Sequence, residues 1–315
     1  MMYVILLIGF LLLIKGADMF VDGSSSIAKI FKVPTIIIGL TIVAMGTSAP
    51  ELAVSLSASI QGNNEIALSN VIGSSIFNLL VVVGVCAIFK TIVPDKDIVK
   101  RDLPLSIVGA VIVLVAPLIT FSITGKLELS MLTGIILAII FIVYLVFLIR
   151  NARKTPAVAT PDEEVKKMSP IKSIIFIVIG LAGIIVGGNF VVDGASDIAS
   201  SFGLSDTLIG LTIVAIGTSL PELVTSIVAS KKGENELSLG NAVGSNIFNI
   251  LLILGVSSAV SPLAVEQQSL WDMGIFVLIT LVILGYIIFR KKIDRKFGIA
   301  MILMYVVYMV YIVLR

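Results

Sequence analysis

One stretch of the sequence is written twice, and this repeat limits the folds that the chain can adopt. Residues 22–85 and 193–256 align without a gap at an offset of 171 residues, and 35 of the 64 positions are identical. The segment Ile38–Glu51 reads IGLTIVAMGTSAPE and returns at Ile209–Glu222 as IGLTIVAIGTSLPE. A repeat of this length predicts two copies of one folding unit.

The composition places both copies in a membrane. Of the 315 residues, 58% are hydrophobic and only 13% are charged, and the mean hydropathy is +1.15. Apolar runs of about 20 residues, the length that crosses a bilayer as a helix, recur along the whole chain. The composition therefore predicts an all-α integral membrane protein that crosses the membrane many times.

The apolar runs predict ten transmembrane helices in two halves of five. The first run lacks a basic leader and a small-residue cleavage pattern, so we expect it to be retained as a span. The halves are 1–150 and 171–315, joined by a polar cytoplasmic linker at 151–170. The ten predicted spans are 2–21, 35–60, 66–89, 103–121, 128–149, 171–191, 206–230, 237–260, 270–289 and 298–314.

Basic residues predict the orientation of these spans. With the N-terminus outside, 19 of the 22 lysines and arginines fall in cytoplasmic loops, Lys126 and Arg315 fall outside, and Lys15 lies within a span. This asymmetry obeys the positive-inside rule. We therefore expect a multi-pass protein of the cell membrane with both termini extracytoplasmic. Asp22 and Asp193 fall at the ends of spans, where we expect them to cap a helix or meet solvent.

Because each half holds an odd number of spans, the second half begins on the opposite side of the membrane. The copies are then antiparallel, which is the inverted repeat of many secondary transporters, whose sites lie near the midplane between the repeats. An inverted repeat favours a transporter, although some channels also contain one.

The repeated motif places a carboxylate beside a predicted helix break. Pro50 donates no backbone hydrogen bond and crowds the carbonyl of Gly46, so the helix should kink there. Glu51 follows the proline, and Glu222 follows the equivalent proline of the second copy. An ionisable residue at membrane depth is expensive to bury and is by default a functional candidate.

Oxygen-bearing side chains recur around both glutamates at helical spacing. No histidine and one cysteine, Cys86, occur in the chain, which excludes histidine-based catalytic triads and zinc sites. Carboxylate, hydroxyl, amide and carbonyl oxygens suit Ca²⁺, Na⁺ or Mg²⁺, and Ca²⁺ takes six to eight of them. Two glutamates neutralise one divalent ion. The candidate side chains are Thr47, Ser48, Glu51, Ser74 and Asn78, then Thr218, Ser219, Glu222, Ser245 and Asn249.

These residues resemble the calcium:cation antiporter superfamily, and within it the prokaryotic relatives of the sodium/calcium exchangers. The resemblance rests on the paired GTSxPE motifs, each followed by GSxxxN, and through the span pattern it covers essentially the whole chain. It implies the sodium/calcium exchanger fold, four adjacent cation sites and exchange of three Na⁺ for one Ca²⁺ by sliding of the first and sixth helices.

The resemblance also implies a role for each motif residue. Glu51 and Glu222 would bind both Ca²⁺ and Na⁺, and the backbone carbonyls of Thr47 and Thr218 would bind Ca²⁺. Asn78 and Asn249 would flank the middle position. Two further Na⁺ sites would be lined by Ala44, Ser48 and Ser74, and by Ala215, Ser219 and Ser245.

The function expected from the sequence is Na⁺/Ca²⁺ antiport by alternating access, normally extruding Ca²⁺. Close glutamates can also carry protons, so H⁺/Ca²⁺ exchange on the same scaffold stays open, as does a cation channel; an intramembrane enzyme fits the motifs less well. Some K⁺-dependent relatives carry aspartate at the position of Asn249, and asparagine argues against K⁺ dependence. We expect no enzymatic activity, no cofactor, no nucleic-acid partner and a functional monomer.

Overall fold

The computed structural model describes residues 2–152, 168–203 and 215–314, and these residues are almost entirely helical. Eight helices in this part of the chain are long and apolar enough to cross a membrane, and a ninth span is a bent pair of helices. The remaining predicted span, 206–230, lies partly outside the described residues, as does most of the predicted linker. The prediction of a multi-pass helical protein is confirmed.

The first copy contains the following elements: α1 Met2–Phe31, α2 Thr35–Ile38, the π-helix η1 Gly39–Val43, α3 Ala44–Thr47, α4 Ala49–Ile60, α5 Asn64–Phe77, the π-helix η2 Asn78–Val82, α6 Val83–Phe89, the π-helix η3 Ile98–Asp102, α7 Leu103–Thr124, the short strand β1 Glu128–Leu129 and α8 Met131–Ala152.

The described part of the second copy contains α9 Pro170–Ser201, α11 Ala215–Thr218, α12 Leu220–Lys231, α13 Asn235–Ile247, the π-helix η5 Phe248–Ile253, α14 Leu254–Val260, the short strand β2 Leu263–Ala264, α15 Gln267–Arg290 and α16 Arg295–Leu314. The long helices follow the same order in both copies, but β1 lies after α7 and β2 lies before its counterpart α15.

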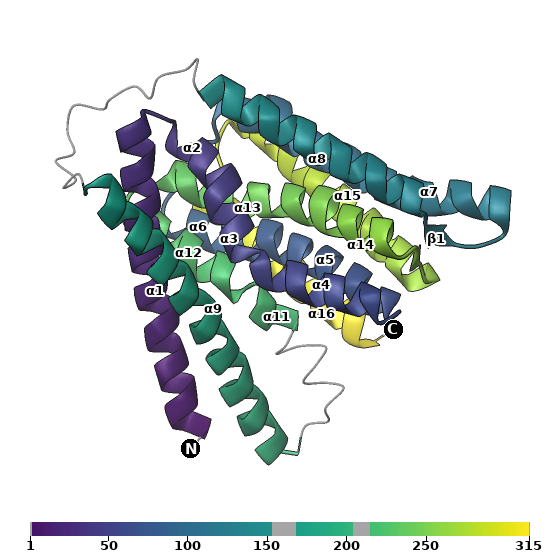
Figure 1. Ribbon diagram of the computed structural model, residues 1–315, viewed down its shortest axis with the longest axis horizontal. Coiled ribbons are helices and arrows are strands. Elements are labelled where there is room, and N and C mark those ends of the chain that lie inside the picture. Colours follow the sequence, from purple (N-terminus) through teal and green to yellow (C-terminus); the bar gives the residue numbers. More distant parts are fainter. Residues whose placement is uncertain (1, 153–167, 204–214, 315) are drawn as a thin grey trace.

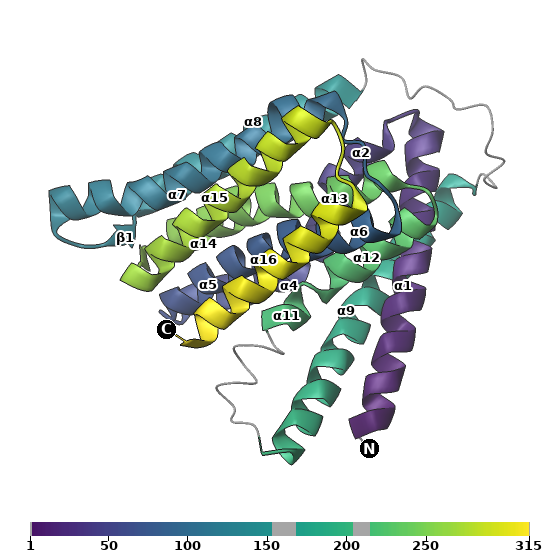
Figure 2. The same cartoon turned by 180° about the vertical axis from the view of Figure 1, so that it is seen from behind.

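The long helices α1 and α9 pack against each other in opposite directions. Gly9 lies against the backbone of Gly187 and Val191, and Gly16 lies against that of Gly180, so the contact ascends one helix as it descends the other. Glycine permits this approach because a β-carbon at any of these glycines would meet backbone atoms. The pair stands at one end of the molecule and projects away from the other helices (Figures 1 and 2).

The centre of the molecule is formed by the two copies of the third predicted span. In Asn64–Phe89 and in Asn235–Val260, 78% of the most apolar window is buried, against 17% in Arg295–Leu314. Helices α7, α8, α15 and α16 surround this centre and expose apolar side chains such as Ile123 and Leu314. An exposed apolar face of this kind suits contact with lipid rather than water.

Loops that the alternation of spans places on one side of the membrane pair with each other. Strand β1 pairs antiparallel with β2, joining the outer end of the predicted span 128–149 to a loop predicted on the outer side; the helix of that span begins only at Met131. Ile92 bridges to Ile293, joining two loops predicted on the inner side. These pairings are consistent with the predicted alternation.

Helix α1 is ten residues longer than the predicted span 2–21, and this changes the setting of Asp22. The added part contains small polar residues, Ser24, Ser25 and Ser26, which are buried, and Ser26 accepts a hydrogen bond from Ser173 of α9. Asp22 therefore lies inside a helix and caps none, but its side chain is 44% exposed and forms an ion pair with Lys232, so the expectation that it meets solvent is confirmed.

Candidate functional site

Each copy of the motif forms a helix break at the predicted place. The segments Thr35–Thr47 and Ala49–Ile60 meet at 49°, and the residue between them is Ser48. Ser219 separates α11 from α12 in the same way, and its backbone dihedrals of −94° and 4° are close to the −85° and 11° of Ser48. The predicted kink is confirmed, and it follows from the missing N–H of the proline two residues later.

Glu51 and Glu222 begin the helices that follow these breaks, and neither exposes any surface. Each carboxylate accepts one hydrogen bond from the opposite copy of the repeat. Ser48 Oγ donates to Glu222 Oε1 at 2.7 Å, and Ser219 Oγ donates to Glu51 Oε1 at 3.3 Å. The structure therefore brings the two halves of the predicted site together, and each half donates a hydrogen bond to the glutamate of the other.

Each glutamate also accepts a hydrogen bond from its own copy. Ser74 Oγ donates to Glu51 Oε1, and Ser245 Oγ donates to Glu222 Oε1, both at 3.4 Å. Only Oε1 of each carboxylate is used. The second oxygen, Oε2, is buried and makes no hydrogen bond to the described residues. These two oxygens are therefore available to a cation.

The contrast with Asp102, another fully buried carboxylate, separates a structural acid from this pair. Arg101 Nε donates to Asp102 Oδ1 at 2.7 Å, and Tyr144 donates to the same oxygen at 2.9 Å. Within the described residues, no basic side chain forms an ion pair with Glu51 or Glu222. A buried charge without a partner is costly, and a bound cation supplies the missing partner.

Asn78 and Asn249 lie at equivalent places in π-helical segments. Asn78 begins η2, and Asn249 is the second residue of η5. Both side chains are fully buried, and none of their amide atoms has a hydrogen-bond partner among the described residues. π-Helical turns occur frequently at functional sites, and buried amides are rarely left unsatisfied without a reason. Ligation of a cation by the carbonyl oxygens is one such reason.

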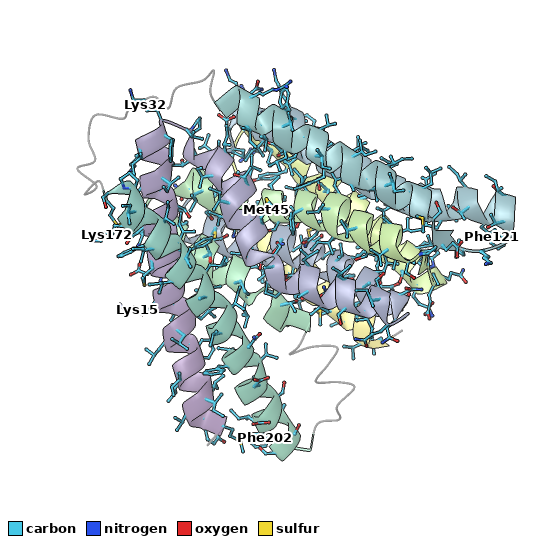
Figure 3. All side chains as sticks on the ribbon, viewed as in Figure 1. Lys15, Lys32, Met45, Phe121, Lys172 and Phe202 are labelled. Carbon is cyan, nitrogen blue, oxygen red and sulfur yellow. The ribbon has the colours of Figure 1, made fainter. Side chains whose placement is uncertain are left out.

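The remaining predicted residues lie at the breaks themselves. Ala44 begins α3, and its carbonyl lies 3.5 Å from Ser245 Oγ, as an alternative to Glu222 Oε1 for the single proton of that hydroxyl. Ala215 begins α11, but its side chain is outside the described part of the chain. Met45, next to Ala44, lies over the middle of the bundle, whereas Lys15 lies on the outer side of α1 (Figure 3).

Two further asparagines belong to the site and were not predicted. Asn241 Oδ1 accepts from Thr47 Oγ1 at 3.0 Å, and Asn70 Oδ1 accepts from Thr218 Oγ1 at 3.5 Å. The sequence did carry a signal for them. Both asparagines are identical between the copies, and each lies one helical turn before the predicted serines Ser74 and Ser245.

The chemistry of the assembled site is that of oxygen ligands around two carboxylates. Among the described residues, no group of three or more histidine, cysteine, aspartate or glutamate side chains could hold a metal ion. Glu51 and Glu222 are the carboxylates that the described residues place at the helix breaks. Hydroxyl, amide and backbone oxygens complete a set that suits hard cations.

Comparison with known proteins identifies the family. The family model described as sodium/calcium exchanger protein matches residues 1–150 and 172–314. The chain belongs to this family. It is a membrane transporter of the cation/Ca²⁺ antiporter type, not an enzyme.

Individual relatives match nearly the whole chain. The sodium/calcium exchanger MaX1 of Methanosarcina acetivorans is 34% identical over 340 residues, which covers 98% of this chain and 97% of that protein. The inner membrane protein YrbG of Escherichia coli is 35% identical over 265 residues, covering 82% and 79%. The structure of the sodium-calcium exchanger NCX_Mj soaked with zero Na⁺ and Ca²⁺ superimposes with a TM-score of 0.84 at 34% identity, covering 99% and 98%.

Proposed function

We propose that this protein exchanges Na⁺ for Ca²⁺ by alternating access and normally extrudes Ca²⁺ from the cell. The observation that carries the proposal is the pair of buried Oε2 atoms on Glu51 and Glu222, which no described residue satisfies. Two ionised carboxylates balance one Ca²⁺. Ser48 and Ser219 each donate a hydrogen bond to the glutamate of the opposite copy, so their hydroxyl oxygens lie beside the carboxylates and can serve as further ligands.

The proposed ligands fall into three groups. Glu51 and Glu222 bind Ca²⁺ and Na⁺ in turn, assisted by the backbone carbonyls of Thr47 and Thr218. Asn78 and Asn249 flank the middle position. Two outlying Na⁺ positions are lined by Ala44, Ser48 and Ser74 and by Ala215, Ser219 and Ser245. The unsatisfied amides of Asn78 and Asn249 support the second group. The contact between Ser245 Oγ and the Ala44 carbonyl joins residues of the two outlying positions, so these positions lie close to each other.

The proposed arrangement in the membrane follows the charge distribution. Two inverted halves, 1–150 and 171–315, flank a cytoplasmic linker at 151–170, and both termini are extracytoplasmic. The antiparallel packing of α1 and α9 supports the inversion, because these helices are equivalent in the two copies. Transport by a monomer suits a site that is assembled within one chain.

The test is uptake of radioactive Ca²⁺ into proteoliposomes loaded with Na⁺. Dilution into Na⁺-free buffer should drive Ca²⁺ inward, with or without K⁺, because Asn249 leaves no third carboxylate for a K⁺ ion to balance. Matched vesicles carry a pH gradient of the same size and no Na⁺ gradient. Uptake that follows only the pH gradient would assign the function to H⁺/Ca²⁺ exchange, which two close glutamates also permit. Uptake that requires K⁺ would overturn the role given to Asn249.

A further inference from the structure

Asn70 and Asn241 make matched sets of hydrogen bonds that tie the two copies of the repeat together. They are equivalent at the offset of 171 residues, and they lie on α5 and α13, the helices at the centre of the molecule (Figure 1). Neither belongs to the ligands proposed above. Their side chains contact four of those ligands, Glu51, Glu222, Thr47 and Thr218.

The donor half of each amide binds within its own copy. Asn70 Nδ2 donates to the backbone carbonyl of Glu51 at 3.3 Å and to Ser55 Oγ at 2.9 Å. Asn241 Nδ2 donates to the carbonyl of Glu222 at 3.3 Å and to Ser226 Oγ at 2.9 Å. Both protons of each amide are used, so each asparagine fixes the helical turn that carries a glutamate.

The acceptor half of each amide binds the opposite copy. Asn241 Oδ1 accepts from Thr47, at the end of α3, and Asn70 Oδ1 accepts from Thr218, at the end of α11. Each threonine directly precedes the serine at a helix break. One amide therefore links the glutamate turn of one copy to the broken helix end of the other.

We propose that Asn70 and Asn241 are positioning residues that set the separation between each glutamate and the threonine carbonyl of the opposite copy. An amide suits this task because it offers two donors and an acceptor in one rigid plane. A Ca²⁺ ion tolerates ligand distances only within a few tenths of an ångström, about 2.3–2.6 Å, so a small shift between the copies weakens binding. The inference rests on the proposed function, since it assumes that both glutamates and both threonine carbonyls bind Ca²⁺.

The two links differ in this structure. The bond from Thr47 to Asn241 is 3.0 Å long and buried, whereas the bond from Thr218 to Asn70 is 3.5 Å long and partly buried. Hydrogen bonds weaken with such lengthening. We therefore expect the loss of Asn241 to affect binding more than the loss of Asn70.

The experiment measures Ca²⁺ binding by purified protein in detergent, using the rise in unfolding temperature with Ca²⁺ concentration. Asn241→Ala should weaken Ca²⁺ binding by about tenfold or more, as losing a partner that orients a metal ligand typically does. Asn70→Ala should weaken it by less. Asn63→Ala, at an exposed position before α5, is the matched control and should bind Ca²⁺ as the wild type does. Unchanged Ca²⁺ affinity in both test variants would overturn the proposal.

Two additional variants separate positioning from direct ligation and from misfolding. Asn241→Asp keeps an oxygen in place and loses both N–H donors, so Ca²⁺ affinity should stay weak; wild-type affinity would instead make Asn241 a ligand.

Thr47→Val removes the hydrogen bond between Thr47 and Asn241 from the other side, and its effect combined with Asn241→Ala should be less than additive. Full additivity would contradict the link. If Asn241→Ala does not fold, Thr47→Val alone should show the loss of Ca²⁺ affinity. Because binding is measured without any gradient, these outcomes stand apart from the choice of Na⁺ or H⁺ as the driving ion.

Discussion

Glu51 and Glu222 carry the charge that the rest of the site must accommodate. Replacing either by glutamine keeps the shape and the Oε1 hydrogen-bond partner but removes half of the charge that balances Ca²⁺. We expect Glu51→Gln and Glu222→Gln each to abolish Ca²⁺ transport while the protein folds, since an unpaired buried charge is lost at the same time. Uptake into proteoliposomes measures the first effect, and the unfolding temperature in detergent measures the second.

A matched control for both variants is Glu266→Gln, an exposed glutamate before α15. It makes the same change of charge far from the helix breaks, so uptake should remain at the wild-type rate. Substantial Ca²⁺ exchange by either site variant would contradict a site built on two glutamates. Equal loss in the control would indicate a general effect of charge on the protein.

At the residue scale, the sequence predicted the residues proposed to bind the cation directly better than the residues that hold them in place. Glu51 and Glu222 were predictable because a carboxylate in an apolar run is costly to bury unless it binds a cation or a proton. The identity of Asn70 and Asn241 between the copies marks these positions, but their role could not be predicted because it depends on contacts with threonines 148 and 194 positions away, in the opposite copy. The pairing of Asp22 with Lys232 could not be predicted for a related reason, since it joins residues 210 positions apart.

Among the elements, α1 and α9 depend most directly on backbone contact. A β-carbon on Gly180 would lie 2.6 Å from the backbone nitrogen of Phe20, which is closer than real contacts allow. Gly180→Ala should therefore lower the unfolding temperature, because one of the helices must move away. Gly274→Ala in α15 is the control, since a β-carbon there meets no atom within 4 Å. Alanine favours helix over glycine by about 1 kcal/mol, so the control should be neutral or stabilising.

The same pair of helices shows why element boundaries could not be predicted from the sequence. The apolar run of α1 ends near residue 21, and the polar Ser24, Ser25 and Ser26 are typical of a loop. They continue the helix because α9 covers them, and that contact is tertiary. The kink before Pro50 was predictable because proline acts within its own turn, whereas π-helical turns such as Asn78–Val82 carry no comparable local signal. If Gly180→Ala left the unfolding temperature unchanged, the close packing of α1 on α9 would not explain why α1 continues as a helix beyond residue 21.

At the scale of the whole molecule, the exchange of three Na⁺ for one Ca²⁺ that the resemblance implies would move charge as well as ions. With both glutamates ionised and asparagine at positions 78 and 249, bound Ca²⁺ leaves the site neutral, and three Na⁺ leave it with one positive charge. Each cycle then moves one charge, and about 2.3 kcal/mol per 100 mV couples exchange to the membrane potential. Ca²⁺ uptake driven by internal Na⁺ should therefore speed up when an ionophore makes the vesicle interior positive. A rate indifferent to potential would contradict the charge count.

The two copies are not equivalent in this conformation. Helix α1 packs along α12, whereas the equivalent pair, α9 and α4, has at most marginal contact in the described part of the chain. Ion pairs also join α1 to the residues that follow α12. Lys232 Nζ lies 2.7 Å from Asp18 and 2.6 Å from Asp22. Lys29 Nζ lies 3.6 Å from Glu234. At the offset of 171 residues, Lys232 corresponds to Gln61 and Asp18 to Asn189. The repeat therefore does not reproduce the ion pairs of Lys232 with Asp18 and Asp22, which lie on the side predicted to be cytoplasmic.

This asymmetry predicts that Lys232 favours the state that is closed toward the cytoplasm. Lys232→Gln removes the ion pairs with Asp18 and Asp22 and makes the opposite state less costly, so the apparent Ca²⁺ affinity measured from the cytoplasmic side should rise. Exposed ion pairs contribute about 0.2–1 kcal/mol each, so the loss of the two pairs of Lys232 should change the affinity roughly two- to thirtyfold. Ca²⁺ uptake into inside-out membrane vesicles, which present the cytoplasmic face, gives this affinity.

Lys231→Gln is the control for this prediction. It removes the same charge from the same turn, but among the described residues Lys231 contacts the ring of Phe89 and no carboxylate within 4.0 Å. The double variant Lys232→Gln, Asp22→Asn should change the affinity by less than the sum of the single changes, because both remove one ion pair. Added choline chloride should shift the wild type toward the variant, since salt screens exposed pairs. An equal effect of Lys231→Gln, or no response to salt, would attribute the bias to packing of α1 on α12 rather than to Lys232.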